Sequence, residues 1–181
     1  FYATSDHELV GFVVDKKLQF NPAKMSRHYF AFDSWYEFNN EENIQSLKRK
    51  FNLPEDKKII LYAPTWRDNQ FYAKGKYKFN LEMDLDRMQE ELGDSYIVIM
   101  RMHYLVAENM DLSSYEGFAY DFSHLEDIRE LYLISDILMT DYSSVFFDYA
   151  NLRRPMIFFV YDIEEYRDNL RGFYFNFEEK A

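Results

Sequence analysis

The stretch Ser135-Asp136-Ile137-Leu138-Met139-Thr140-Asp141-Tyr142-Ser143-Ser144-Val145-Phe146-Phe147-Asp148 decides the fold of this 181-residue chain. It predicts a short buried strand, a polar turn and the beginning of a helix. Ser143 and Ser144 fall where that helix would begin, and unpaired backbone N–H groups there favour a phosphate. Asp148 lies about one helical turn further on, on a similar face, where a carboxylate could hold the hydroxyls of a ribose. We therefore expect a site for a nucleotide diphosphate.

The same residues have an ordinary structural interpretation as a helix N-cap. Ser and Asp oxygens commonly accept hydrogen bonds from the first N–H groups of a helix, and Asp141-Tyr142-Ser143-Ser144 supplies such oxygens. Capping and phosphate binding are compatible, so the remainder of the sequence has to distinguish them.

The composition favours a single domain with a substantial core. Of the residues, 48% are hydrophobic and 20% aromatic, while only 5 are Gly and 4 are Pro. The lack of cysteine excludes disulfides, thiolate metal sites and a cysteine nucleophile, and it fits a cytoplasmic compartment. The net charge of −11 disfavours nucleic acid and anionic membrane surfaces as partners. No apolar run approaches the roughly 18–20 residues that span a bilayer.

Apolar runs and helical spacings alternate along the chain. The runs predict strands at 9–15, 58–63, 96–100, 118–122, 136–140 and 155–161. Apolar residues at helical spacing predict helices at 41–51, 84–92, 128–134 and 145–151, and 65–79 is expected to be a loop. Buried strands that alternate with helices indicate an α/β fold with a parallel sheet covered on both faces.

In such a sheet, the residues that follow the strands meet at the carboxyl edge, where ligands bind. Polar and basic side chains collect at these positions although the chain as a whole is acidic. They are Pro64-Thr65-Trp66-Arg67, Arg101-Met102-His103, Asp141-Tyr142-Ser143-Ser144 and Asp162. This convergence predicts an active edge.

Each of these side chains has two interpretations from its position alone. His103 is a candidate general acid or base or phosphate ligand, and equally a hydrogen-bonded loop histidine. Arg101 and Arg67 are able to clamp phosphate oxygens or to pair with one of the many carboxylates. Thr65 is able to donate to a phosphate or to cap a turn.

Several familiar signatures are missing. The sequence has no Gly-x-Gly-x-x-Gly, no P-loop motif and no Gly-x-Ser-x-Gly elbow, which disfavours dehydrogenases, P-loop NTPases and α/β-hydrolases. His and acidic residues do not show metal-ligand spacing. The acidic pair Glu164-Glu165 is expected on a solvated face.

Taken together, the motifs resemble a known family, the CDP-glycerol glycerophosphotransferases, which are the teichoic acid polymerases of Gram-positive bacteria. The segments that carry the resemblance occur in the family's order: Tyr62-Ala63-Pro64-Thr65-Trp66-Arg67, Arg101-Met102-His103, Ser135-Asp136 and Asp141-Tyr142-Ser143-Ser144-Val145-x-x-Asp148. Arg154-Pro155, Tyr161-Asp162 and Glu165-Tyr166 are similar as well.

The resemblance implies a GT-B glycosyltransferase architecture, in which two Rossmann-like domains face each other across a cleft. It covers about residues 41–181, which would be the Rossmann-like donor-nucleotide domain, half of that architecture, truncated before its closing helices. Residues 1–40 do not match the family and are left as an unassigned N-terminal segment.

The resemblance also implies roles for particular residues. The substrate-binding positions that carry over are Pro64, Thr65, Arg67, Arg101, Met102, Ser143, Ser144 and Asp148. Ser143 and Ser144 would bind the pyrophosphate and Asp148 the ribose. His103 would be the catalytic residue that neutralises or protonates the departing CMP phosphate. No metal or other cofactor is implied, so basic side chains and the helix dipole would stabilise the developing charge.

The expected reaction transfers glycerol phosphate, or a related polyol phosphate, from a CDP-linked donor to a teichoic acid or lipid-linked acceptor. The partners would be CDP-glycerol and that acceptor, without nucleic acid. The family implies a cytoplasmic location at the inner face of the cell membrane, with attachment through regions outside this chain.

Two other functions remain open. One is a non-catalytic nucleotide-binding module, and the other is a GT-B transferase that uses a different nucleotide sugar. The family's acceptor-side histidine base has no counterpart that can be placed here. We therefore expect this chain alone to bind a cytidine nucleotide without transferring the polyol. The sequence does not distinguish glycerol from ribitol or a primase from a polymerase.

Overall fold

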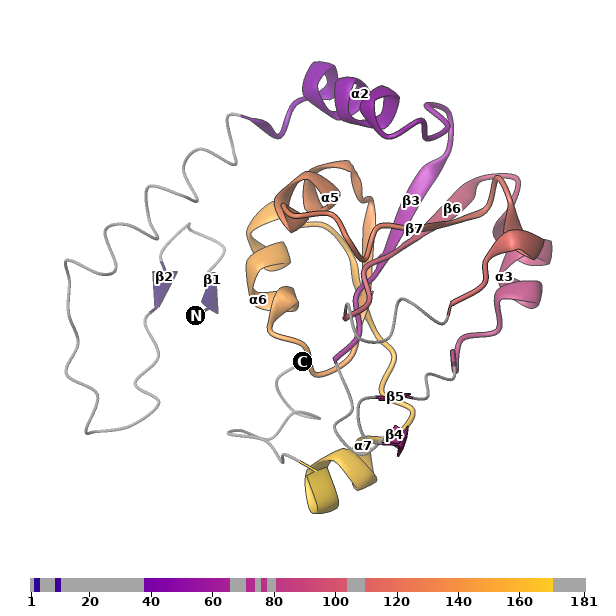
Figure 1. Ribbon diagram of the computed structural model, residues 1–181. Helices are drawn as coiled ribbons and strands as arrows, with labels where there is room; N and C mark the ends of the chain where they lie inside the picture. Colours follow the sequence, from indigo (N-terminus) through magenta and orange to yellow (C-terminus); the bar gives the residue numbers. More distant parts are fainter. Residues whose placement is uncertain are drawn as a thin grey trace.

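Five apolar segments form one parallel β-sheet in the computed structural model (Figure 1). Its strands are β3 (Lys58–Tyr62), β6 (Tyr96–Met100), β7 (Ala119–Asp121), β8 (Ile137–Thr140) and β9 (Met156–Phe158). The structure describes residues 2–3, 9–10, 38–65, 71–73, 76–77, 81–103 and 110–170. Four of the five residues in β3 and in β6 are buried, as expected of central strands covered on both faces.

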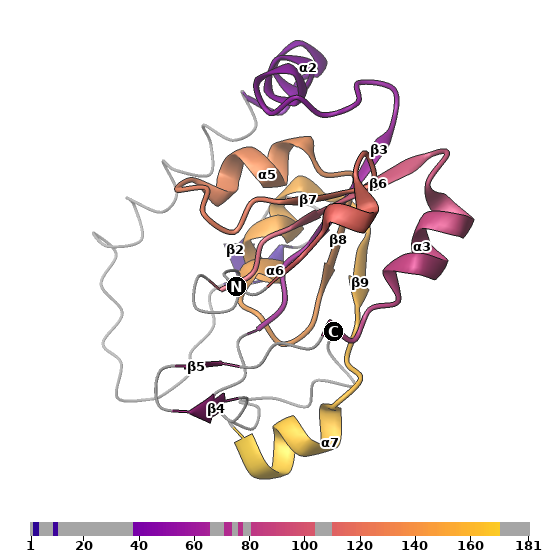
Figure 2. The same ribbon diagram turned by 45° about the vertical axis from the view of Figure 1, so that its right-hand side comes forward.

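The strand order β7-β6-β3-β8-β9 places the first of these strands in the middle of the sheet (Figure 2). In β3, Leu61 lies opposite Ile99 of β6 on one side and Leu138 of β8 on the other. The chain adds β6 and β7 outward from β3, then restarts with β8 on the opposite side. Ligands of such sheets bind where the order reverses, at the carboxyl ends of β3 and β8.

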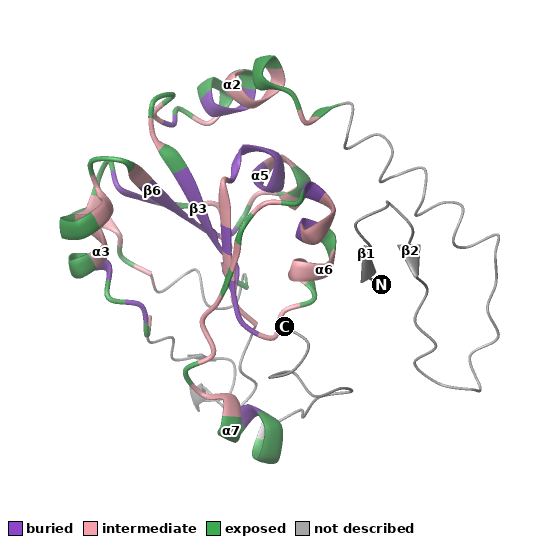
Figure 3. Cartoon of the chain, turned by 180° about the vertical axis from the view of Figure 1, so that it is seen from behind, coloured by how far each residue is buried: buried purple, intermediate pink, exposed green. Residues whose placement is uncertain are grey.

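Helices cover both faces of the sheet (Figures 1 and 3). One core cluster joins Ile59 and Leu61 to buried residues of α2 (Glu41–Lys50), α5 (Ile128–Ile134) and the pair α6 (Val145–Tyr149) and η2 (Ala150–Leu152). The other joins Ile60 and Tyr62 to α3 (Leu85–Leu92) and to residues beside η1 (Ser113–Tyr115). Successive residues of β3 therefore face opposite helix layers, which confirms the predicted arrangement.

Side-chain caps fix where three of the helices begin. Asn40 accepts a hydrogen bond from the Asn43 N–H at the start of α2. Asp84 and Asp127 do the same for α3 and α5. These oxygens satisfy N–H groups that have no partner within the helix. They explain why the predicted boundaries of α3 and α5 agree with the structure.

Three segments differ from expectation. The loop expected at 65–79 contains an antiparallel pair, β4 (Phe71–Ala73) and β5 (Lys76–Tyr77), whose strands are too short to show a period in the sequence. The strand predicted at 155–161 ends at Phe158, because only its first residues pair with β8. The strand predicted at 9–15 includes β2 (Leu9–Val10), which pairs with β1 (Tyr2–Ala3), and its remainder lies outside the described residues.

A further turn of helix follows the sheet, formed by α7 (Ile163–Glu165) and η3 (Tyr166–Leu170). It lies beyond the carboxyl edge of the strands (Figures 1 and 2). Glu164 and Glu165 are exposed, which confirms their predicted solvated face, while Tyr166 is buried. In the part of the chain that the structure describes, no helix has the length and apolar character needed to cross a membrane.

Candidate functional site

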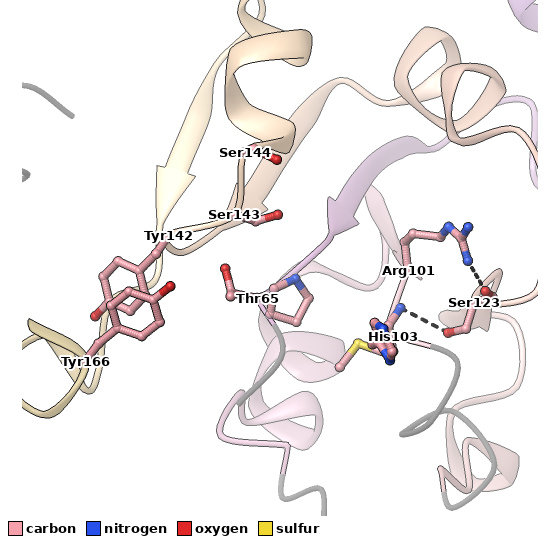
Figure 4. Close-up of a pocket in the computed structure, with 10 residues that line it drawn as sticks. Thr65, Arg101, His103, Ser123, Tyr142, Ser143, Ser144 and Tyr166 are labelled. Atoms are coloured by element: carbon pink, nitrogen blue, oxygen red, sulfur yellow. Dashed lines mark hydrogen bonds between the residues drawn. The ribbon is translucent and has the colours of Figure 1, made fainter. Parts of the chain in front are cut away.

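A pocket of about 560 Å³ opens at the carboxyl edge of the sheet, where ligand binding was predicted (Figure 4). Its lining comes from the segments that follow β3, β6, β7 and β8, together with η3. The lining residues are Pro64, Thr65, Arg101, Met102, His103, Ser123, Tyr142, Ser143, Ser144 and Tyr166. Eight of them lie in the segments expected at this edge from the sequence, and seven of those eight were given a site role, so the strand ends converge as predicted.

Ser143 and Ser144 present the hydroxyl side of this pocket (Figure 4). Ser144 occupies the N-cap position of α6, yet its side chain makes no capping hydrogen bond. The pure capping interpretation is therefore wrong for Ser144, which is exposed and lines the pocket. Because α6 has only five residues, its helix dipole would contribute less to anion binding than the serine hydroxyls.

Thr65 and Ser143 are held together by one carboxylate. Oδ1 of Asp141 accepts hydrogen bonds from the backbone N–H of Thr65 at 2.7 Å and of Ser143 at 3.2 Å. Asp141 is only 2% exposed. Just before it, Oγ1 of Thr140 donates to the carbonyl oxygen of Ala63 at 2.6 Å. These hydrogen bonds therefore hold the segments that follow β3 and β8 next to each other at the pocket.

Arg101 and Ser123 form the opposite side of the pocket (Figure 4). Nη1 of Arg101 donates to the carbonyl oxygen of Ser123, and Oγ of Ser123 accepts from the Met102 N–H at 3.0 Å. The guanidinium carries five N–H donors, so this bond orients it while leaving donors for an anion. Ser123 itself is 2% exposed, and no pattern in the sequence indicated it.

Met102 and His103 continue this segment in opposite environments. The Met102 side chain packs into the core and is 3% exposed, which makes it a support for the site as well as a lining residue. His103 is exposed at the pocket, where imidazole is accessible to a ligand. Pro64 ends β3 beside them, because it has no N–H to continue a ladder.

A pair of tyrosines lines the remaining side. The rings of Tyr142 and Tyr166 stack with their centroids 4.1 Å apart and an interplanar angle of 25°. The Tyr142 hydroxyl lies 3.2 Å from Oδ1 of Asp162, to which it donates. These contacts join η3 to the turn that carries the serines. The sequence placed Tyr142 at the predicted active edge without giving it a role, and it did not place Tyr166 there, although both fall in segments that carried the family resemblance.

Two predicted residues are not among the described lining residues. Arg67 is outside the described residues. Asp148 is exposed on α6 and does not line the pocket. The pKa of Tyr132 in α5 is raised mainly by burial and, to a lesser extent, by the negative charge of Asp148. A contact between Asp148 and a ribose therefore stays a prediction.

The chemistry of this pocket is suited to a phosphorylated ligand. Hydroxyls, a guanidinium and an imidazole are all able to donate hydrogen bonds to phosphate oxygens. The described residues include no group of three or more His, Asp or Glu placed to hold a metal ion.

Comparisons with known proteins agree with this geometry. The family model described as CDP-Glycerol:Poly(glycerophosphate) glycerophosphotransferase matches residues 31–181, so the prediction that residues 1–40 lie outside the family match is wrong for residues 31–40. The chain is 63% identical over 169 residues to a teichoic acid poly(glycerol phosphate) polymerase of Bacillus subtilis (strain 168), covering 93% of this chain and 23% of that relative. It is 47% identical over 142 residues to a teichoic acid glycerol-phosphate transferase of Staphylococcus aureus (strain NCTC 8325 / PS 47), covering 78% and 36%.

A solved structure of the wall teichoic acid polymerase TagF superposes with a TM-score of 0.75 at 52% identity, over 83% of this chain and 37% of that one. The match confirms the predicted fold class, a Rossmann-like α/β sheet within a GT-B architecture. The match covers only about a quarter of the length of the Bacillus subtilis relative. With its family model matched over most of its length, the chain belongs to the CDP-glycerol:poly(glycerophosphate) glycerophosphotransferase family.

Proposed function

We propose that the pocket binds the CDP-linked donor of a polyol phosphate transfer reaction. The observation that carries the proposal is the convergence of Thr65, Arg101, His103, Ser143 and Ser144 on one pocket at the reversal point of the sheet. The family to which the chain belongs supports the same ligand class. A structural relative adds support, because crystals of a TagF variant were soaked with CDPG.

In the proposed reaction, a terminal hydroxyl of the acceptor attacks the β-phosphate of the donor. The new bond joins the acceptor oxygen to that phosphorus, and the bond to the bridging oxygen breaks. CMP leaves with the bridging oxygen, and the glycerol phosphate is carried to the acceptor. The proton of the attacking hydroxyl must pass to a base, for which the described residues offer no assigned candidate.

Seven of the lining residues have proposed tasks. Ser143, Ser144 and Thr65 donate to the diphosphate through their hydroxyls, because the N–H groups of Thr65 and Ser143 already donate to Asp141. Arg101 stabilises the negative charge that grows on the bridging oxygen, since a fixed cation acts strongly in a partly enclosed site. His103, as the catalytic residue, neutralises the same oxygen or supplies its proton. Pro64 and Met102 shape the floor.

Glycerol phosphate is the group we propose to be transferred. The relative that is 47% identical and those that are 55–63% identical all carry glycerol phosphate in their names, whereas a poly(ribitol-phosphate) polymerase of Bacillus spizizenii is 42% identical. The acceptor would be a teichoic acid chain or its lipid-linked start. We place the reaction at the inner face of the cell membrane, as the resemblance implies, with attachment made elsewhere than in the described residues.

The test is calorimetric titration of the chain with CDP-glycerol, CDP, CMP and UDP-glucose. We expect selective binding of the cytidine diphosphate ligands. In the double variant Ser143→Ala/Ser144→Ala, loss of two hydroxyl donors should weaken CDP-glycerol binding about tenfold or more. The same titration with Ser113→Ala/Ser114→Ala is the matched control, because this second serine pair is exposed on η1, outside the pocket lining.

Three results would contradict the proposal or the roles given to its serines. A folded chain that binds UDP-glucose as tightly as CDP-glycerol would favour a transferase for another nucleotide sugar. A folded chain that binds none of these ligands would favour a module without a donor site. Equal affinity in the two serine double variants would move the phosphates away from Ser143 and Ser144.

A further inference from the structure

Asp141 lies at the point where the strand order of the sheet reverses. It directly follows β8, and β8 pairs with β3 at the centre of the sheet. Its side chain is directed across this boundary, where Oδ1 lies 2.7 Å from the Thr65 nitrogen and 3.2 Å from the Ser143 nitrogen. One carboxylate oxygen thus joins two segments that both line the pocket.

A carboxylate is an unexpected group to find behind a site proposed for a diphosphate. Its negative charge repels the ligand, and the repulsion is stronger in a partly buried site than in water. Burial of the charge is itself unfavourable unless N–H groups compensate it. Asp141 is 2% exposed and accepts two such groups, so its environment suits a residue that holds backbone in place.

Asp136, at the other end of the same strand, provides a comparison. Its Oδ2 accepts a hydrogen bond from the Ile59 N–H at 2.8 Å, so it also links the β8 segment to β3. That bond lies at the amino end of the strands, away from the pocket lining. Asp136 therefore stabilises strand pairing alone, whereas Asp141 also sets the relative position of Thr65 and Ser143.

We propose that Asp141 is a positioning residue of the donor site, which holds the backbone of Thr65 and Ser143 at the spacing that the diphosphate requires. This inference rests on the proposed function for the identity of the ligand. Asp141 acts through the two residues that it holds, and it takes no part in proton transfer. What matters is its acceptor oxygen, and its charge is a disadvantage for the ligand.

Two substitutions of Asp141 should therefore differ in their effect on CDP-glycerol affinity. In Asp141→Asn, the amide oxygen still accepts both N–H groups and the negative charge is removed. CDP-glycerol affinity should then stay within about threefold of wild type or become tighter. In Asp141→Ala, both hydrogen bonds are lost and affinity should fall about tenfold or more. Asp136→Ala, the matched control, should lower the melting temperature and leave affinity unchanged.

Amide hydrogen exchange measured by NMR tests the same role without a ligand. The Thr65 and Ser143 amides should be protected in wild type and in Asp141→Asn, and they should exchange faster in Asp141→Ala. If Asp141→Ala does not fold, Asp141→Asn still decides, because retained protection with retained affinity is expected only of an acceptor role.

Several results would overturn the inference. One is wild-type affinity and unchanged exchange in Asp141→Ala. Another is a loss in Asp141→Asn as large as that in Asp141→Ala, which would mean that the charge itself acts. A third is a matching loss of affinity in Asp136→Ala. If the wild-type chain bound no CDP-glycerol, the proposed function would fail, while the exchange measurement would still show whether Asp141 holds the two segments.

Discussion

Replacing Arg154 with alanine should destabilise the fold by about 2–3 kcal/mol, because its side chain closes the buried end of α5. Nη1 of Arg154 donates to the carbonyl oxygens of Leu133 at 2.7 Å and Tyr132 at 3.2 Å, and to that of Ser135. Nη2 donates to Oδ1 of Asn39 at 2.6 Å. The arginine thus connects the last turn of α5 to the segment that precedes α2.

The size of this destabilisation depends on which of the carbonyl oxygens bound by Arg154 would keep another hydrogen-bond donor in the alanine variant. The Ser135 carbonyl would retain the Tyr149 hydroxyl at 2.9 Å, and the Tyr132 carbonyl would retain the Ser135 N–H at 3.3 Å. The Leu133 carbonyl would lose the donor described for it, at a cost of about 1–3 kcal/mol for a buried polar group. Loss of a cation at a helix C-terminus adds about 0.3–1 kcal/mol.

The assay is urea denaturation followed by circular dichroism, with Arg154→Lys and Arg49→Ala as companions. Lysine keeps the charge without the planar fork, so it should recover only part of the loss. Arg49 makes an exposed ion pair with Glu55, with side chains 58% and 51% exposed, and its removal should cost less than about 1 kcal/mol. Equal free energies of unfolding for Arg154→Ala and Arg49→Ala would refute the reasoning.

Two further predictions concern the pocket and the core. Ser123→Ala should weaken CDP-glycerol binding about fivefold in the same titration, because the Met102 N–H loses its acceptor, and Ser123→Thr should recover it. Burial raises the pKa of Tyr132 and of Tyr149, so the folded state favours neutral phenols. The contribution of these two phenols to the free energy of unfolding should be fully present below about pH 10, where tyrosine titrates in the unfolded chain, and it should be lost as the pH rises above that value. The unfolding free energy measured from pH 8 to 11 should decline less in Tyr149→Phe, and an equal decline would exclude this cause.

The parallel sheet was predictable because burial on both faces makes central strands continuously apolar. The residues 58–63 and 96–100 therefore stand out in the sequence, and the helix predicted at 128–134 agrees with α5 at both ends. The carboxyl edge was predictable for a related reason, since parallel strands bring their following residues to one edge. Sequence order alone thus located most of the pocket lining.

The remainder of the site was hidden by the lack of a period. Ser123 follows a strand of three residues, and a lone serine there has no distinctive pattern. Tyr166 is the buried residue described in a segment of otherwise exposed or half-buried side chains, so 163–170 showed no amphipathic spacing. Both residues reach the pocket through tertiary contacts, which local sequence does not encode.

The net charge of −11 makes a phosphorylated ligand seem an unsuitable partner for this chain. The acidic residues near the pocket do not line it, so the net charge of the chain does not describe the charge at the pocket. Of the ten described lining residues, Arg101 and His103 are basic and none is Asp or Glu. The aspartates nearest the strand ends instead accept hydrogen bonds from backbone or hydroxyl donors in their own or neighbouring segments.

Three aspartates follow this rule. Asp121, the last residue of β7, accepts the Ser123 N–H at 2.8 Å, and Asp162, after β9, accepts the Tyr142 hydroxyl at 3.2 Å. Asp141, after β8, accepts the N–H groups of two lining residues. Each of these acids accepts hydrogen bonds from residues of the segments that carry the pocket, so the acids order those segments without lining the pocket. At the proposed diphosphate site, the charged lining residues are therefore Arg101 and His103, which explains how an acidic chain can offer a site for an anion.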